Sequence, residues 1–321
     1  MSDVELRDHY QVEVSGGALH VHDLTSPALL GDARLAGNVV IALHGITANG
    51  LTWQPVASAV GRAGGPPVRF LAPDLRGRAG SRELTGPWGL AAHVDDVLAV
   101  AHAFGAATIT LVGHSMGAFV AALAAARYPQ RVRSLVLVDG GPAFPAPPDL
   151  EVDAALTAVI GPAMERLGMR FDDRAAYLDF WRAHPALGPL FAGTTAGALQ
   201  AYLLHDLRED GDALVSTCVP EAIRADGGDV LADPEVHAAV RTAVGHGIPT
   251  QLLWARRGLM DEPQGLYDEQ RLAALELPAA LRVTPVPDTN HYTILLERGP
   301  AEAVAAAVAV ASAAGQQVSE A

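Results

Sequence analysis

The chain alternates between short apolar runs and longer stretches with apolar residues at helical spacing. Residues 11–14 and 18–22 alternate apolar with polar around the turn Ser15-Gly16-Gly17, which predicts a strand pair. Continuously apolar runs follow, as is typical of strands buried on both faces of a parallel sheet. These runs are 38–43, 68–72, 108–112 and 134–138. The stretches between them, 52–61, 90–104 and 118–128, have the apolar spacing and end signals of helices.

This rhythm stops near residue 140 and returns near residue 248. The intervening segment has helical pieces at 173–182 and 195–207, separated by Pro and Gly, and no buried-strand run. Strand patterns resume at 249–254 and 281–286, and a last helix is predicted over 300–314. Alternating strands and helices predict an α/β fold. We therefore expect an eight-stranded, mostly parallel sheet with helices on both faces and a helical cap after the sixth strand, with the core at 1–140 and 248–321 and the cap at 141–247.

The composition and charge of the chain indicate which classes of partner and which location to expect. The net charge is −14, and all 22 basic residues are arginines. An acidic chain is a poor partner for nucleic acid or an anionic membrane surface, so neither is expected. The N-terminal residues lack an apolar signal core, and the apolar run 301–314 is too short to span a bilayer, so a cytoplasmic location is expected. The single cysteine, Cys218, excludes an intramolecular disulfide and is expected to be an ordinary half-buried thiol.

One pentapeptide carries the candidate chemistry. The sequence Gly113-His114-Ser115-Met116-Gly117 fits Gly-x-Ser-x-Gly and stands between a predicted strand and a predicted helix. In that setting the turn is sharp and strained, so glycine suits the crowded positions two before and two after the serine. The hydroxyl of Ser115 is left exposed at the sheet edge as a candidate nucleophile.

Together with other short segments, this turn resembles the α/β-hydrolase superfamily. The segments are His44-Gly45-Ile46, Asp74-Leu75-Arg76-Gly77-Arg78 and Asn290-His291. The Gly-His-Ser-Met-Gly form is similar to that of capped, esterase-like members. The resemblance covers about 38–138 and 249 to the C-terminus, and it implies the hydrolase sheet and a Ser-His-acid triad.

A serine hydrolase needs donors for the oxyanion of its tetrahedral intermediate, and two such N–H groups are typically worth several kcal/mol. The residue after the nucleophile, Met116, supplies one backbone N–H. The resemblance places the other in the loop after strand 38–43, and we assign it to Ile46. His44 is interpreted as a structural residue that steadies this loop.

The base is expected late in the chain, because the hydrolase order is serine, acid, histidine. His291 follows the last predicted strand and meets this condition. The acid is expected after strand 249–254, where Asp261 fits best. Asp139, at the end of the preceding strand, and Glu262 stay as alternatives.

These residues predict cleavage of a carboxylic ester through an acyl-enzyme intermediate. A lactonase or carbon–carbon bond hydrolase with the same triad is the alternative, and a non-catalytic ligand-binding protein on this fold is the third hypothesis. A serine nucleophile disfavours epoxide hydrolysis and dehalogenation, which this superfamily performs with an aspartate at that position. No cofactor or metal is expected, the partner is a small ester or lactone, and a homodimer stays open. Candidate substrate-binding residues are Trp53, His114, Phe144, Trp181, Phe191 and Tyr202.

Overall fold

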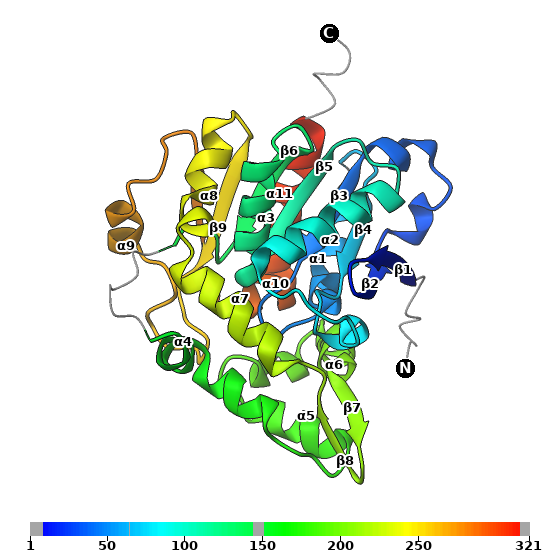
Figure 1. The fold of residues 1–321 in the computed structure, drawn as a ribbon, viewed down its shortest axis with the longest axis vertical. Helices are drawn as coiled ribbons and strands as arrows, with labels where there is room; N and C mark the ends of the chain where they lie inside the picture. The colour runs from blue at the N-terminus through cyan, green and yellow to red at the C-terminus, as the bar shows by residue number, and fades with distance from the viewer. Residues whose placement is uncertain (1–8, 64, 144–150, 315–321) are drawn as a thin grey trace.

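The structure is a computed structural model, and it describes residues 9–63, 65–143 and 151–314. Its centre is an eight-stranded sheet (Figure 1) in which β2 runs antiparallel to β1 and β4 and the other neighbours are parallel. The mostly parallel eight-stranded α/β sheet expected from the sequence is thus confirmed. In spatial order the strands are β1 (His9–Val14), β2 (Gly17–Asp23), β4 (Arg69–Pro73), β3 (Val39–Leu43), β5 (Ile109–His114), β6 (Val132–Val138), β9 (Thr250–Ala255) and β10 (Arg282–Val286).

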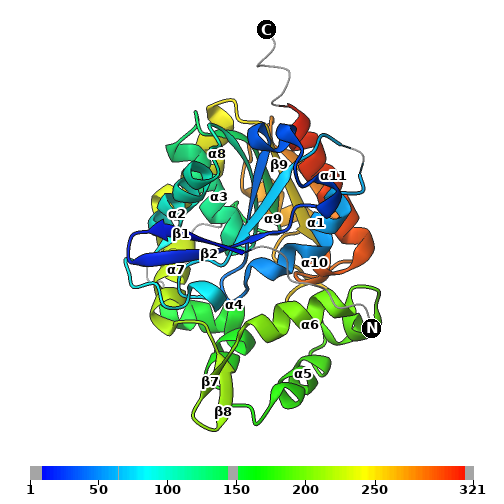
Figure 2. The same ribbon diagram turned by 90° about the vertical axis from the view of Figure 1, so that its right-hand side faces the viewer.

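Apolar side chains leave the central strands on both faces, which explains the continuous apolar runs. In β3, Val39, Ile41 and Leu43 enter one core cluster, and Val40 and Ala42 enter the other. Helices cover both faces (Figure 2). The first cluster is closed by α2 (Leu90–Ala103), α3 (Met116–Arg127) and α8 (Pro234–Gly245), and the second by α1 (Gln54–Val60), α10 (Thr293–Leu296) and α11 (Arg298–Ala314).

The segment between β6 and α8 lies over the carboxyl edge of the sheet (Figure 1). It contains α4 (Val152–Leu167), α5 (Arg174–Arg182), α6 (Ala196–His205), β7 (Leu207–Asp210), β8 (Ala213–Ser216) and α7 (Pro220–Ala232). Below, "the cap" means α4 through β8. The short remaining elements are α9 (Glu269–Ala274), η1 (Pro27–Leu29), η2 (Ala33–Gly37), η3 (Gly50–Trp53), η4 (Ala79–Ser81) and η5 (Gly188–Ala192).

The inserted segment differs from the expected all-helical cap in two ways. The antiparallel hairpin β7–β8 turns at Gly211, whose φ is +65°, and its strands have no continuously buried run that would predict them. The helix α8 packs on α3 in the layer that covers the sheet, although the sequence range 141–247 assigned it to the cap. No helix within the described ranges is long and apolar enough to cross a membrane.

The turn between β5 and α3 is wedged between backbones of its neighbours. Ser115 has φ 54° and ψ −125°, a strained conformation for a residue with a side chain. A Cβ at Gly113 would stand 2.2 Å from the carbonyl oxygen of Gly117. A Cβ at Gly117 would stand 2.2 Å from the carbonyl oxygen of Leu43 on β3. Both motif glycines are therefore required by close backbone approach, for the reason inferred from the sequence.

Gly117→Ala is therefore expected to destabilise the fold by about 3 kcal/mol or more, because the obstructing atom is backbone and cannot rotate away. Gly197→Ala in α6 is the matched control, because nothing lies within 4 Å of its Cβ position. The control should change the free energy of unfolding by less than about 1 kcal/mol. Urea unfolding of both variants checks this, and equal stability of the two would contradict the wedged turn.

Candidate active site

A cavity lies between the carboxyl edge of the sheet and the cap, and Ser115 and His291 both line it. Ser115 reaches it from the turn before α3, and His291 from the loop between β10 and α10. The loop after β3 forms another wall, with Ile46 facing the cavity. The remaining lining residues are Gly45, Thr47, Ala48, Thr52, His114, Ile160, Ala163, Tyr202, Leu259 and Tyr292. The structure thus brings together the predicted nucleophile, the predicted base and the predicted oxyanion loop.

The carboxylate that holds the His291 ring is Asp139, not Asp261. His291 Nδ1 donates to Asp139 Oδ2 over 2.6 Å, and the other carboxylate oxygen accepts the Ala255 backbone N–H over 3.0 Å. Asp139 is fully buried, so these two bonds supply the partners that a buried carboxylate needs. Its φ of 44° turns it out of the end of β6. With Nδ1 carrying the proton, Nε2 of His291 is the basic nitrogen.

The expectation that Asp261 holds His291 is therefore corrected. Asp261 Oδ1 accepts from Asn290 Nδ2 over 2.8 Å and pairs with Arg257 Nε over 3.1 Å. It contacts the residue before the base rather than the base itself. The second alternative, Glu262, accepts the Met260 backbone N–H within its own loop.

His44 braces the loop after β3, as inferred from the sequence. Its Nε2 accepts the Leu75 backbone N–H over 2.8 Å, so Nδ1 carries the proton and donates to the Gly45 carbonyl over 2.8 Å. Burial lowers the pKa of His44 to about 3, which keeps the ring neutral. A neutral, fully buried imidazole with both nitrogens occupied is a structural brace and is not available as a base.

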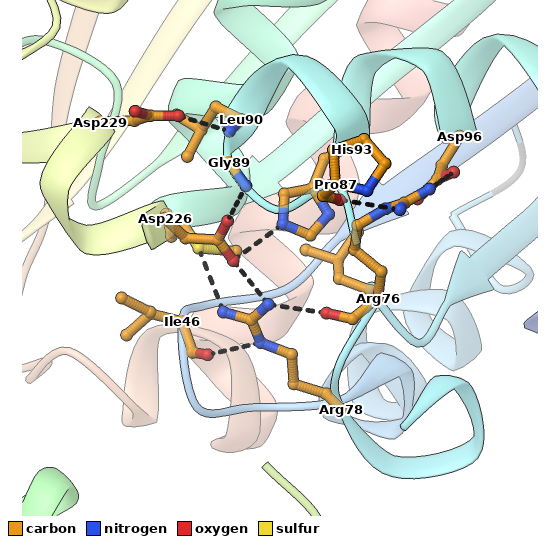
Figure 3. A network of polar contacts seen from close by, with 12 residues as sticks. Ile46, Arg76, Arg78, Pro87, Gly89, Leu90, His93, Asp96, Asp226 and Asp229 are labelled. Atoms are coloured by element: carbon orange, nitrogen blue, oxygen red, sulfur yellow. Dashed lines mark hydrogen bonds and ion pairs between the residues drawn. The ribbon is translucent and has the colours of Figure 1, made fainter. Parts of the chain in front are cut away.

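Arg78 fixes the same loop from the other side (Figure 3). Its Nε donates to the Ile46 carbonyl over 2.9 Å, and its Nη1 pairs with Asp226 at 2.5 Å. Asp226 also accepts from His93 Nε2 and the Gly89 backbone N–H, both over 2.9 Å. All three side chains, Arg78, Asp226 and His93, are fully buried. The guanidinium thereby orients the peptide group that begins at the Ile46 carbonyl, and burial makes that orientation costly to change.

Two backbone N–H groups border the site without a partner. Among hydrogen bonds formed by the described residues, none uses the N–H of Ile46 or of Met116. Met116 opens α3, where helix N–H groups are unsatisfied and the helix dipole is positive. A Cβ at Gly45 would stand 3.2 Å from Ser115 Cβ, so this glycine lets the loop come close to the serine.

His114, the second residue of the motif, orients the base through its backbone. Its Nε2 donates to the His291 carbonyl over 2.8 Å, and the two ring centroids are 4.6 Å apart. Burial, with the nearby His291, holds the pKa of His114 well below its ordinary value. Its Nδ1 is buried with no hydrogen-bond partner in the described structure, which agrees with a neutral ring.

The other predicted substrate-binding residues divide by position. Tyr202 on α6 lines the cavity, as expected. Trp53 and Trp181 do not line it, because both are packed in the second core cluster, where bulky rings fill space. Phe191 lies beneath the Arg182 guanidinium, and Phe144 lies outside the described residues. The cavity is also lined by Ile160, Leu259 and Tyr292, which were not predicted from the sequence. Of these, only Tyr292, next to His291, had a positional signal.

The match of residues 38–297 to the model of the alpha/beta hydrolase fold family decides the classification. The chain belongs to the alpha/beta hydrolase family. This confirms the superfamily resemblance drawn from the motifs. N-formylmaleamate deformylase of Pseudomonas putida is 30% identical over 267 residues, which cover 79% of this chain and 82% of that protein.

Two further comparisons give a partial sequence match and a structural likeness. Lipase LipV of Mycobacterium tuberculosis is 35% identical over 100 residues, and the match spans only 36% of that lipase and 31% of this chain. The solved structure of E-2-(acetamidomethylene)succinate hydrolase superposes with a TM-score of 0.67 at 20% identity, covering 92% of this chain and 96% of that one. The family match and the deformylase, matched over most of its length, agree with a hydrolase, whereas the solved structure at 20% identity shows the shared fold alone.

Buried neutral histidines make the hydrolase sensitive to acid. The pKa of His44 in the folded chain lies below its unfolded value of about 6.5. Below pH 6.5 the imidazole of His44 is therefore protonated in the unfolded chain and stays neutral in the folded chain. His114 acts in the same direction. Stability is present above pH 6.5 and falls as the pH drops, by about 2 kcal/mol from His44 alone between pH 6.5 and 5.

We expect His114→Gln to lose less stability than the wild type over this pH range, because glutamine does not titrate and its amide can still donate to the His291 carbonyl. The control, exposed His246→Gln, should follow the wild-type pH dependence. Denaturant unfolding at pH 6.5 and 5 measures the difference. An unchanged pH dependence in His114→Gln would contradict the lowered pKa, because it would mean that this ring binds its proton equally in the folded and unfolded chain.

Proposed function

We propose that the hydrolase cleaves a carboxylic ester through an acyl-enzyme on Ser115, with His291 as base and Asp139 as the acid of the triad. One observation carries the assignment. The buried bond from His291 Nδ1 to Asp139 Oδ2 leaves Nε2 basic in a cavity that Ser115 also lines. Asp139 replaces the acid preferred from the sequence, and it is one of the alternatives retained there.

The proposed reaction follows from the positions of these groups. Ser115 Oγ attacks the ester carbonyl while His291 Nε2 takes its proton, and Asp139 stabilises the resulting imidazolium. The N–H groups of Ile46 and Met116 receive the oxyanion. Collapse expels the alcohol, which takes the proton from Nε2, and water then hydrolyses the acyl-enzyme by the same route in reverse.

A neutral, small acyl group is the substrate that fits these walls best. Among the described residues that line the cavity, none is an arginine, and Ile46, Ala48, Ile160, Ala163 and Leu259 make much of the wall apolar. The names of the deformylase and succinate-hydrolase substrates denote carboxylates, which need a cationic partner in a buried site. A neutral ester is therefore favoured over a carboxylate-bearing amide for this chain.

Ser115→Ala is expected to abolish labelling by a fluorophosphonate probe and to lower turnover of a neutral p-nitrophenyl ester by about 10⁶-fold, because no acyl-enzyme can form. Ser58→Ala, an exposed serine on α1, is the control and should label and turn over like the wild type. A wild type that neither labels nor hydrolyses the ester would favour the binding-protein hypothesis. Turnover of lactones alone would favour the lactonase.

Asp139→Asn and Asp261→Asn separate the two candidate acids. An amide at 139 can donate to Nδ1, which shifts the His291 proton to Nε2 and removes the base, so kcat should fall by about 10⁴-fold. Asp261→Asn should change kcat only a few-fold, because its partners are Asn290 and Arg257. Steady-state kinetics of both variants measure the two losses in kcat. A larger loss in Asp261→Asn than in Asp139→Asn would make Asp261 the acid of the triad.

A further inference from the structure

Three histidines and an aspartate converge away from the proposed active site. His20 and His22 come from β2, Asp74 follows β4, and His205 ends α6 of the cap. One ligand atom from each lies within 4.8 Å of those of all the others, and no other such group occurs among the described residues. The spacing of these residues in the sequence does not predict the cluster. It indicates only that His20 and His22 lie on the same face of a strand, because side chains at i and i+2 do so.

The Asp74 carboxylate is the centre of the cluster. It is fully buried, and it accepts from His22 Nε2 over 3.2 Å and from His205 Nε2 over 2.7 Å. The backbone N–H groups of Gly50 and Gly80 also donate to it, over 2.8 and 3.0 Å. These backbone bonds fix the carboxylate independently of the imidazoles.

The chain leaves space for the rings at this point. A Cβ at Gly80 would stand 2.6 Å from His20 Cγ, and a Cβ at Gly50 would stand 2.8 Å from His22 Cδ2. His20 Nδ1, next to Cγ in the ring, accepts from the Gln11 side-chain amide over 3.1 Å. With that amide turned over, its oxygen would accept an Nδ1–H, which is the outer hydrogen bond that orients an imidazole binding a metal through Nε2.

We propose that His20, His22, Asp74 and His205 form a binding site for a divalent transition-metal ion, with Zn²⁺ as the best fit. Imidazole suits zinc, and four protein ligands without an open position are typical of a structural zinc site. Ligand atoms around tetrahedral zinc stand about 3.3 Å apart at bond lengths of about 2.0–2.1 Å. The four ligand atoms observed here lie within 4.8 Å of one another. Side-chain movements of about an ångström would bring them to the tetrahedral spacing.

The ion would tie the cap to the core. Three ligands belong to the sheet region, and the fourth, His205, belongs to α6. Tyr202 on the same helix lines the cavity, and its carbonyl accepts from Asn49 Nδ2 over 2.9 Å. The His205 side chain is 24% exposed, which gives the ion a way in from solvent. Metal binding would therefore fix α6, and with it one wall of the cavity, without taking part in the chemistry at Ser115.

The test uses the full chain without a histidine tag, stripped with a chelator and then titrated with Zn²⁺ against a chromogenic competitor. The wild type should bind one Zn²⁺ per chain. His205→Gln and His20→Gln should weaken binding at least 100-fold. The glutamine amide at 205 can still donate to Asp74, so that variant keeps the hydrogen bond while losing the ligand. His246→Gln, on an exposed histidine outside the cluster, should bind like the wild type.

Zn²⁺ should also raise the Tm of the wild type by several degrees and leave that of His205→Gln unchanged, because only a folded state with an intact site gains from the ion. The Tm without metal shows whether each variant is folded. Failure of the wild type to retain Zn²⁺, or equal affinity of wild type and both glutamine variants, would overturn the site and leave a hydrogen-bonded cluster around Asp74. Neither result depends on the activity proposed for Ser115.

Discussion

Close backbone contact around the turn before α3 is the constraint on which the site depends. Gly117 lies directly against the Leu43 carbonyl of β3, so the turn that carries Ser115 and the loop 44–46, which begins just after Leu43, are in direct contact. The Ser115 carbonyl lies just as close to Gly140, since a Cβ there would stand 2.4 Å away. The carboxyl ends of β3, β5 and β6 therefore lie within a few ångströms of one another. Residues 44–46, 115 and 139, which follow these strands, are for that reason gathered at the same edge of the sheet.

Buried carboxylates hold the loops around this edge. Asp226 restrains Arg78 and through it the Ile46 carbonyl, and Asp139 restrains the His291 ring. In the cap, Asp206 pairs with buried Arg166, whose guanidinium also donates to the Thr47 carbonyl over 3.3 Å. Each is paired or hydrogen-bonded, as the cost of burying a charge demands. The loop after β3 is thus tied to the segment after β4, to α7 and to the cap by charged groups as well as by apolar packing.

The cap contributes uncharged walls to the cavity, whereas the polar residues Ser115 and His291 reach it from the core. Its contributions to the cavity wall, from Ile160, Ala163 and Tyr202, carry no charge. Its polar contacts instead face the core, through Arg166 to Thr47 and through His205 to Asp74. The residues by which the insertion lines the cavity are therefore different from the residues that anchor it to the core. A metal at the His205 cluster would strengthen that anchor.

The sequence by itself determined the eight-stranded sheet and the turn at Ser115, because apolar periodicity and glycine spacing are local signals. It also indicated His291, through the order of catalytic residues in the superfamily that it resembles. It left the acid open between Asp139, Asp261 and Glu262, since all follow sheet strands and only the direction of each side chain separates them. The β7–β8 hairpin was not predicted because its strands have no continuously buried run. Most of the cavity wall and the histidine cluster were decided by tertiary structure alone. Their residues meet only after distant segments fold together, and one sequence carries no record of which side chains come to face each other.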